Sequence, residues 1–295
     1  MKSLALPLPQ LKTRRLSDFW ALTKPGVMGA VVLTALFGFL LGSPEGPVRW
    51  TLLINTLLGT ALAAAGAGIL NMLLEQEVDD LMERTKNRPI PAGHVASHEA
   101  FLLGGLCAGL GVVHLCLAVG MRSGFLAAMT LVLYLVFYTP SKTSTTYCSI
   151  VGSVSGALPP LIGFSAAAGT LTPAAWVLFA ILFLWQFPHL LALSWIYRKD
   201  YENAGLKMLP SPGPKGERTG KIALACAVLL FIASLLPWPA GLTGPFYLVP
   251  AVLLSSYLLF RAERFAFQLN DASARKLFLA SVVYTPLLLA AMVIW

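Results

Sequence analysis

Charged residues are scarce in this chain of 295 residues: they make up 12% of it, against roughly 25% in a typical globular protein. Acids are the scarcer sign, with 13 Asp and Glu against 21 Lys and Arg. This composition excludes a disordered chain, a collagen and a coiled coil. It also weakens the usual link between a net charge of +8 and nucleic-acid binding, because a basic surface needs a polar surface around it. We therefore expect no nucleic-acid partner.

Cysteine is also scarce, with four in the chain, and its placement argues against disulfide bonds or a zinc site. All four cysteines lie in apolar stretches without CxxC spacing, namely Cys107, Cys116, Cys148 and Cys226. Neither a disulfide framework nor a zinc site is indicated.

Apolar residues are abundant instead, at 57% of the chain with a mean hydropathy of +0.75. A bilayer core about 30 Å thick needs roughly 20 apolar residues per helix, and the alternation typical of a β-barrel is absent. The sequence predicts an all-α polytopic membrane protein, with nine transmembrane helices in one bundle around a central cavity that opens to the cytoplasmic side. The predicted spans are about 26–42, 51–73, 100–120, 123–139, 148–169, 174–196, 221–241, 244–260 and 276–294.

The placement of Lys and Arg supports this count. With the N-terminus in the cytoplasm, all 21 basic residues except Arg49 and Arg122 fall in cytoplasmic segments, as the positive-inside rule requires. Residues 1–25 then form a cytoplasmic N-terminal segment and residues 26–295 one membrane domain with a periplasmic C-terminus. The N-terminal extension is short for a mitochondrial presequence, which favours a bacterial inner membrane.

Three GxxxG patterns occur inside predicted spans. They are Gly38/Gly42, Gly105/Gly109 and Gly152/Gly156. Such patterns allow close helix packing, and we expect packing within one bundle in preference to a dimer interface.

The acids gather in one short segment. Residues 75–99 hold six Asp and Glu against three Lys and Arg, a local reversal of the overall charge. In a cytoplasmic loop, acidic residues have no role in setting topology. The enrichment therefore needs another cause.

A four-residue spacing connects these acids to the end of the second span. Helical pattern continues to about Glu83, so Asn71, Glu75, Asp79 and Glu83 are predicted to share one helix face. A divalent cation turns repulsion between such carboxylates into coordination, and ligands that are all oxygen favour Mg²⁺. The alternative is a solvated loop that keeps the helix end in water. Asn71 favours a site, because it lies within the apolar span.

A second polar cluster follows the sixth span. Gln186 and His189 lie in membrane-embedded sequence on one helix face, with Pro188 between them, and a Tyr197–Glu202 segment follows. An intramembrane His is often only a hydrogen-bonded packing residue, and a substrate contact is the other interpretation.

These residues resemble a known family. The segment from Asn71 to Pro89 is similar to the first signature of the UbiA-type intramembrane prenyltransferases, with Glu75 in place of the usual Asp. Within that superfamily, Trp185-Gln-Phe-Pro-His189 and the run from Lys199 to Pro210 resemble the haem O synthases, or protohaem IX farnesyltransferases. The segments Leu22–Pro25 and Gly156–Gly163 extend the resemblance over most of the chain.

The resemblance implies the reaction and the roles of the residues. Farnesyl diphosphate would be transferred to a vinyl group of haem b, and water addition would give haem O. Mg²⁺ would be held by Asn71, Glu75, Asp79 and Asp200. The remaining catalytic candidates are Arg84, Arg88 and Lys199, and the substrate-binding candidates are Asp80, Lys86, Gln186, His189, Tyr201, Lys142 and Arg198.

Among the substrate-binding candidates, Lys142 and Arg198, together with Lys207, would pair with haem propionates at the membrane surface. The implied partners are the two substrates, the lipid bilayer, and haem A synthase or terminal oxidase assembly factors. One rival function is a UbiA-type enzyme that prenylates an aromatic quinone precursor. A second is a transporter, which would place its charges near the bilayer midplane instead of at helix ends.

Overall fold

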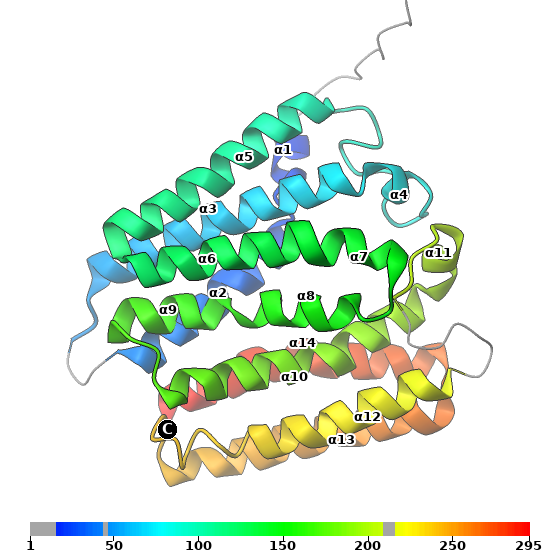
Figure 1. The fold of residues 1–295 in the computed structure, drawn as a ribbon. Coiled ribbons are helices and arrows are strands. Elements are labelled where there is room, and N and C mark those ends of the chain that lie inside the picture. The colour runs from blue at the N-terminus through cyan, green and yellow to red at the C-terminus, as the bar shows by residue number, and fades with distance from the viewer. Residues whose placement is uncertain (1–15, 44–46, 209–215) are drawn as a thin grey trace, which may run out of the picture.

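The computed structural model describes residues 16–43, 47–208 and 216–295, and every regular element in these ranges is a helix (Figure 1). The first half contains α1 (Leu16–Leu22), α2 (Pro25–Gly42), α3 (Trp50–Leu74), α4 (Gln76–Asp80), α5 (Ser97–His114), η1 (Leu115–Val119), α6 (Met121–Val132), η2 (Leu133–Tyr138) and α7 (Thr139–Ser144). The second half contains α8 (Cys148–Ala157), α9 (Pro159–Ala168), α10 (Pro173–Ile196), α11 (Arg198–Asn203), α12 (Glu217–Ala233), η3 (Pro245–Tyr247), α13 (Leu248–Gln268) and α14 (Asp271–Ile294).

Most of the membrane spans agree with the hydrophobic runs of the sequence, but α12 ends at Ala233, eight residues before the predicted 241, and α13 continues to Gln268, eight residues beyond the predicted 260. Eight helices within the described residues are long and apolar enough to cross a bilayer. The remaining predicted span corresponds to α12, which has 17 residues and packs between α10 and α13. An all-α polytopic membrane fold is therefore confirmed, and the count of nine stays a prediction.

The segments predicted to be cytoplasmic share one end of the bundle (Figure 1). Helices α4, α7 and α11 lie there together with the turn from α13 to α14, and the C-terminus lies at the opposite end. An ion pair of 2.6 Å between Arg198, which follows α10, and Asp271, which begins α14, joins two of these segments. The arrangement agrees with the positive-inside pattern, and which end faces the cytoplasm stays a prediction.

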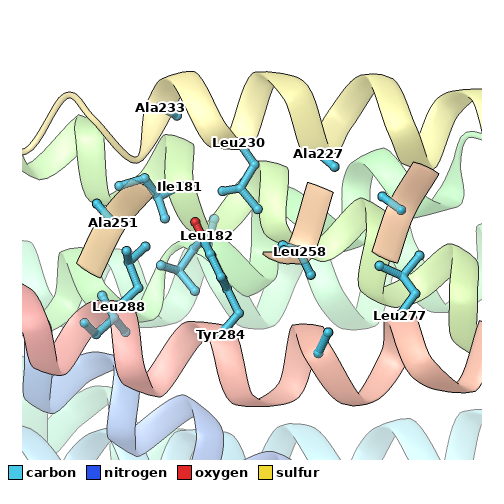
Figure 2. Close-up of a cluster of buried hydrophobic side chains, with 14 of the residues drawn as sticks. Ile181, Leu182, Ala227, Leu230, Ala233, Ala251, Leu258, Leu277, Tyr284 and Leu288 are labelled. Carbon is cyan, nitrogen blue, oxygen red and sulfur yellow. The ribbon is translucent and has the colours of Figure 1, made fainter. Parts of the chain in front are cut away.

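The largest apolar core lies between α10, α12, α13 and α14 (Figure 2). Leu182 of α10, Leu230 of α12 and Leu258 of α13 meet there. Tyr284 of α14 extends into this core, and its hydroxyl lies 2.6 Å from Ser234 Oγ and 3.0 Å from Ser255 Oγ. These bonds satisfy a hydroxyl that would be costly to bury alone.

Glycines bring α2 and α9 into backbone contact, as the GxxxG pattern predicted. A Cβ on Gly38 would lie 2.0 Å from the carbonyl oxygen of Pro160, and one on Gly163 would lie 1.9 Å from that of Ala35. The pair Gly152/Gly156 also packs inside the bundle, against the side chains of Tyr138 and Gln186.

The prediction was wrong for Gly105 and Gly109. Both lie on the outer face of α5, where an added Cβ would meet nothing within 4 Å. The neighbouring small residues, Gly104, Ala108 and Gly111, face α3 instead. A GxxxG pattern shows that two small residues share a face, but not which face is buried.

These contacts predict opposite effects for one substitution at two glycines. Gly163→Ala should destabilise the protein by about 1–3 kcal/mol, because the methyl group would overlap the backbone of α2. Gly105→Ala should leave stability unchanged or raise it by up to about 1 kcal/mol, since alanine favours the helix and the site is open. Thermal unfolding of both variants in detergent checks this, and a loss of stability at Gly105 equal to that at Gly163 would contradict the packing.

Candidate active site

Asn71, Glu75 and Asp79, called the acidic motif below, lie where α3 ends and α4 begins. The backbone bonds from Glu75 N to Asn71 O (3.0 Å) and from Asp79 N to Glu75 O (2.7 Å) keep the four-residue spacing across this junction. The helix ends at Asp80, however, and not near Glu83. Glu83 is 79% exposed and pairs with Lys86 at 2.7 Å, so the shared face comprises Asn71, Glu75 and Asp79 only.

Asn71 is buried and held at both ends of its amide. Its Nδ2 donates to Thr139 Oγ1 at 2.9 Å, and its Oδ1 accepts a hydrogen bond from Lys24 Nζ. Thr139 Oγ1 in turn donates to the carbonyl of Tyr134 at 2.8 Å. The amide oxygen of Asn71 is therefore directed at the lysine that precedes α2.

Glu75 is paired with Lys142. The Nζ of Lys142 lies 2.6 Å from Glu75 Oε1, each side chain is 13% exposed, and the ammonium group stacks 4.4 Å from the ring centre of Tyr138. Lys142 belongs to α7, which follows the π-helix η2 without a break. The prediction had assigned Lys142 to a haem propionate at the membrane surface, whereas the structure places it inside the acidic motif.

Asp79 is fully buried at the end of α4. Its Oδ2 lies 2.5 Å from Arg88 Nη1, and its backbone carbonyl accepts a bond of 2.9 Å from Thr85 Oγ1. Its other carboxylate oxygen, Oδ1, is buried and has no hydrogen-bond partner among the described residues. A buried carboxylate oxygen without a partner is costly, and it is suited to a cation that is bound during turnover.

Burial and neighbouring charges shift the pKa values of Lys24 and Glu75. Burial, reinforced by the positive charge of Arg88, lowers the pKa of Lys24 to about 7. Burial on its own would raise the pKa of Glu75, but the charges of Lys142 and Lys24 outweigh it and hold that pKa below its usual value. Glu75 therefore stays ionised at neutral pH, whereas the Lys24 ammonium is easily lost.

A cavity of about 270 Å³ begins at this cluster and runs into the bundle. Its walls are mostly apolar and include Val31, Leu131 and Ile162. Lys24 and Tyr138 line it as well. Because Lys24 bonds to Asn71 and Tyr138 lies beside Lys142, the acidic motif adjoins one end of the cavity.

Gln186 and His189, the two membrane-embedded candidates on α10, lie in different surroundings. Gln186 lines the cavity, with its Nε2 donating to the carbonyls of Ser153 (2.9 Å) and Leu182 (3.1 Å). His189 does not line it. Its ring stacks on Trp185 with 4.8 Å between ring centres, and its Nδ1 lies 2.9 Å from Ser281 Oγ of α14. A contact between His189 and substrate stays a prediction, and the structure gives the residue packing partners.

Helix α11 packs against the segment that follows α4. Tyr201 of α11 is buried with Met82 and Tyr138, and the guanidinium carbon of Arg84 lies 4.9 Å from the ring centre of Tyr197. Burial raises the pKa of the Tyr201 phenol, so its hydroxyl stays protonated. The structure thus brings Arg84 and Tyr201 to the same end of the bundle as the acidic motif.

The other candidates lie further out. Lys199 and Asp200 line a separate hollow of about 190 Å³, and Arg198 lies beside them, paired with Asp271 and stacked on Trp195. Asp80, Lys86 and Lys207 are exposed. The roles predicted for these residues stay predictions.

The residues present fit a hard divalent cation that is shared with a substrate. Within the described ranges, no three His, Cys, Asp or Glu side chains lie close enough together to hold a metal alone. Mg²⁺ typically binds through one or two carboxylates and completes its shell with water and substrate phosphate oxygens. Glu75, the unpartnered oxygen of Asp79 and the Asn71 amide are oxygen donors of the kind that such a partial shell would use, and their role as metal ligands stays a prediction.

Sequence reasoning missed two direct contacts to the motif. Lys24 lies 47 residues before Asn71, and Lys142 lies 67 residues after Glu75. A local signal exists for each: Lys24 precedes the proline that begins α2, and Lys142 is the one basic residue between the predicted spans 123–139 and 148–169.

Comparison with known proteins agrees with this geometry. Residues 31–284 match the UbiA prenyltransferase family, and the chain belongs to that family. It is 39% identical over 285 residues to a protoheme IX farnesyltransferase of Solibacter usitatus (strain Ellin6076), covering 94% of this chain and 98% of that one. It is 43% identical to a protoheme IX farnesyltransferase of Opitutus terrae (strain DSM 11246 / JCM 15787 / PB90-1), covering 95% of both. The fold is similar to that of a UbiA homolog from Archaeoglobus fulgidus bound to DMAPP and Mg²⁺, with a TM-score of 0.63, 15% identity, and 94% and 100% of the two chains covered.

Proposed function

We propose that this protein transfers the farnesyl group of farnesyl diphosphate to a vinyl group of haem b. The observation that carries the proposal is the junction between the Asn71–Asp79 face and the apolar cavity, which Lys24 joins by lining the cavity and bonding to Asn71. An ionic head and a hydrocarbon tail on one substrate match these two neighbouring environments.

The diphosphate would bind at the acidic end of the cavity. Mg²⁺, when bound, neutralises charge on the diphosphate and favours its departure as the leaving group. Glu75 and Asp79 Oδ1 would hold the ion, which would compete with Lys142 for Glu75, whereas Arg88 pairs with the other oxygen of Asp79, Oδ2. Lys142 and Arg88 would donate charge-assisted hydrogen bonds to the diphosphate. Asp200 is proposed as a ligand for a second ion, and Lys199 and Arg84 as further phosphate contacts.

The bond between C1 of the farnesyl chain and the bridging oxygen would then break, and the diphosphate would leave with the electron pair. Lys142 and Arg88 would stabilise the charge that grows on the leaving group, which lowers the barrier because that charge is greatest in the transition state. The apolar walls formed by residues such as Val31 and Ile162 would keep water from the allylic cation.

The proposed acceptor comes from the relatives and from the resemblance to haem O synthases. The two relatives are named protoheme IX farnesyltransferases and match almost the whole chain. Attack by a vinyl group of haem b on the allylic cation, followed by addition of water to the new cation and release of one proton to solvent, would give a hydroxyethylfarnesyl side chain. Gln186 would orient a substrate, a role supported by its amide in the cavity wall.

Mg²⁺ dependence is part of the proposal. It is supported by the buried, unpartnered Oδ1 of Asp79 and by the Archaeoglobus fulgidus homolog, which was solved with DMAPP and Mg²⁺. We also propose that the chain lies in a bacterial inner membrane with a cytoplasmic N-terminus, and that haem A synthase or terminal oxidase assembly factors receive its product. The positive-inside pattern supports the orientation.

The acceptor decides between this function and prenylation of a quinone precursor. Purified protein with Mg²⁺ and farnesyl diphosphate should convert haem b to a farnesylated product, detected by mass spectrometry, and should leave 4-hydroxybenzoate unchanged. Turnover of the aromatic acid alone would refute the assignment. Solute flux through reconstituted protein without Mg²⁺ would favour a transporter instead.

Gln186 provides a residue-level test of the cavity. Gln186→Leu should lower turnover about tenfold, because an oriented amide is lost from the cavity wall while its volume is kept. Steady-state kinetics with each substrate varied, together with thermal unfolding, separate this effect from misfolding. Unchanged turnover in a stable variant would show that Gln186 serves only to bind the carbonyls of Ser153 and Leu182.

A further inference from the structure

A basic hollow of about 300 Å³ lies between α13 and α14 and shares none of its described lining residues with the apolar cavity. Three of the side chains that line it are cationic: Arg261, Arg264 and Lys276. No carboxylate from the described residues lines the hollow. The nearby Asp271 is engaged by Arg198, whose ion pair also places the hollow at the same end of the bundle as α11. A local excess of positive charge therefore remains.

The three cations have no acidic partner in the part of the chain that the structure describes. Arg261 donates from Nη2 to the Tyr257 hydroxyl at 3.0 Å, and its Nε is buried without a partner. Arg264 stacks on Phe260 at 5.3 Å from the ring centre. A buried guanidinium nitrogen without an acceptor, beside two further cations, favours the binding of an anion.

The first turn of α14 adds to this preference. Ala272 and Ser273 line the hollow at the start of a 24-residue helix. Asn270 Oδ1 caps Ser273 N at 2.8 Å, which leaves earlier amides of the turn free to bind a ligand. The positive end of the helix dipole favours a phosphate at this position.

The outer face of α13 identifies the rest of the ligand. Leu253, Tyr257 and Phe260 are exposed and lie three or four residues apart, so they form one stripe that leads to Arg264. In a membrane protein such a stripe faces acyl chains. The occupant should therefore carry an anionic head and a hydrocarbon tail.

We propose that this hollow binds the headgroup of an anionic phospholipid, with its acyl chains along α13. Basic pockets between transmembrane helices recognise anionic lipid headgroups, and each basic residue near the headgroup strengthens binding about fivefold. The site lies apart from the cavity and would anchor the α13–α14 turn to one leaflet.

Native mass spectrometry of the purified full chain tests this with phosphatidylglycerol and with phosphatidylcholine of the same acyl chains. The native protein should retain phosphatidylglycerol preferentially. The triple variant R261Q/R264Q/K276Q should bind it about a hundredfold more weakly. The control R218Q/K221Q/R275Q removes the same charge from exposed positions at the same end, and should bind like the native protein.

Three results would overturn the proposal. Equal weakening in the two triple variants would show general charge attraction, and equal retention of the two lipids would show no headgroup recognition. Displacement of phosphatidylglycerol by millimolar inorganic phosphate would identify a free-phosphate site. If R261Q/R264Q/K276Q does not fold, R264Q/K276Q replaces it, since both of these side chains are exposed, and it should lose about twenty-five-fold.

Discussion

Replacing Asp79 by Asn should lower turnover by about 10³-fold while leaving the protein inserted and folded. The amide keeps the size of the side chain, and its oxygen can still accept the bond from Arg88 Nη1. What it removes is the negative charge, including that on the buried and unpartnered Oδ1. Mg²⁺ affinity should fall with activity, because an amide is a weaker ligand for a hard cation.

Glu77→Gln is the matched control for this substitution. Glu77 lies two residues earlier on α4 and is exposed, so loss of its charge should change neither Mg²⁺ binding nor turnover. Turnover with haem b and calorimetric titration of Mg²⁺ in the presence of farnesyl diphosphate measure the two effects. Substantial activity in Asp79→Asn would refute the metal assignment, and equal losses in both variants would point to a general effect of charge on the loop.

Replacing Lys142 by Met should affect both stability and catalysis. Without Mg²⁺, the variant should be less stable than the native protein by on the order of 3 kcal/mol. The reason is that the Glu75 side chain, which is only 13% exposed, loses its ion-pair partner. Added Mg²⁺ should restore more stability to the variant than to the native protein, since a cation then takes the place of the ammonium. Turnover should still fall about 10²-fold, because the leaving diphosphate loses a donor.

Denaturant unfolding in detergent, with and without Mg²⁺, separates these two roles of Lys142. Lys221→Met serves as the control, because Lys221 is exposed on α12 and far from the motif in sequence. Equal stabilisation of the native and Lys142→Met proteins by Mg²⁺ would contradict the idea that lysine and metal compete for Glu75.

Much of the fold could be predicted because its determinants are local. Long apolar runs and the placement of Lys and Arg identified the helices, although the predicted ends of the spans at α12 and α13 lie eight residues from the ends in the structure. The shared face of Asn71, Glu75 and Asp79 followed from a four-residue spacing, which the backbone bonds preserve. Glu83 was misplaced because the helix ends at Asp80, and helix ends are the least predictable part of such a pattern.

The contacts that complete the site could not be predicted, because they join distant parts of the chain. Lys24 reaches Asn71 only because α2 packs beside α3, and Lys142 reaches Glu75 from α7, the helix that continues directly from η2. Similarly, Gln186 and His189 lie three residues apart on α10, yet one lines the cavity and the other faces α14. Spacing predicts which side chains are neighbours on a helix, but not which other helix they meet.

The position of the metal tests the central claim most directly. Crystals grown with Mn²⁺ and a non-hydrolysable farnesyl diphosphate analogue should show an anomalous peak within coordination distance of Asp79 Oδ1, bounded by Glu75 and by oxygens of the diphosphate. The farnesyl chain should occupy the cavity lined by Val31 and Ile162. A metal peak away from the junction of α3 and α4, with the diphosphate bound elsewhere, would contradict the account.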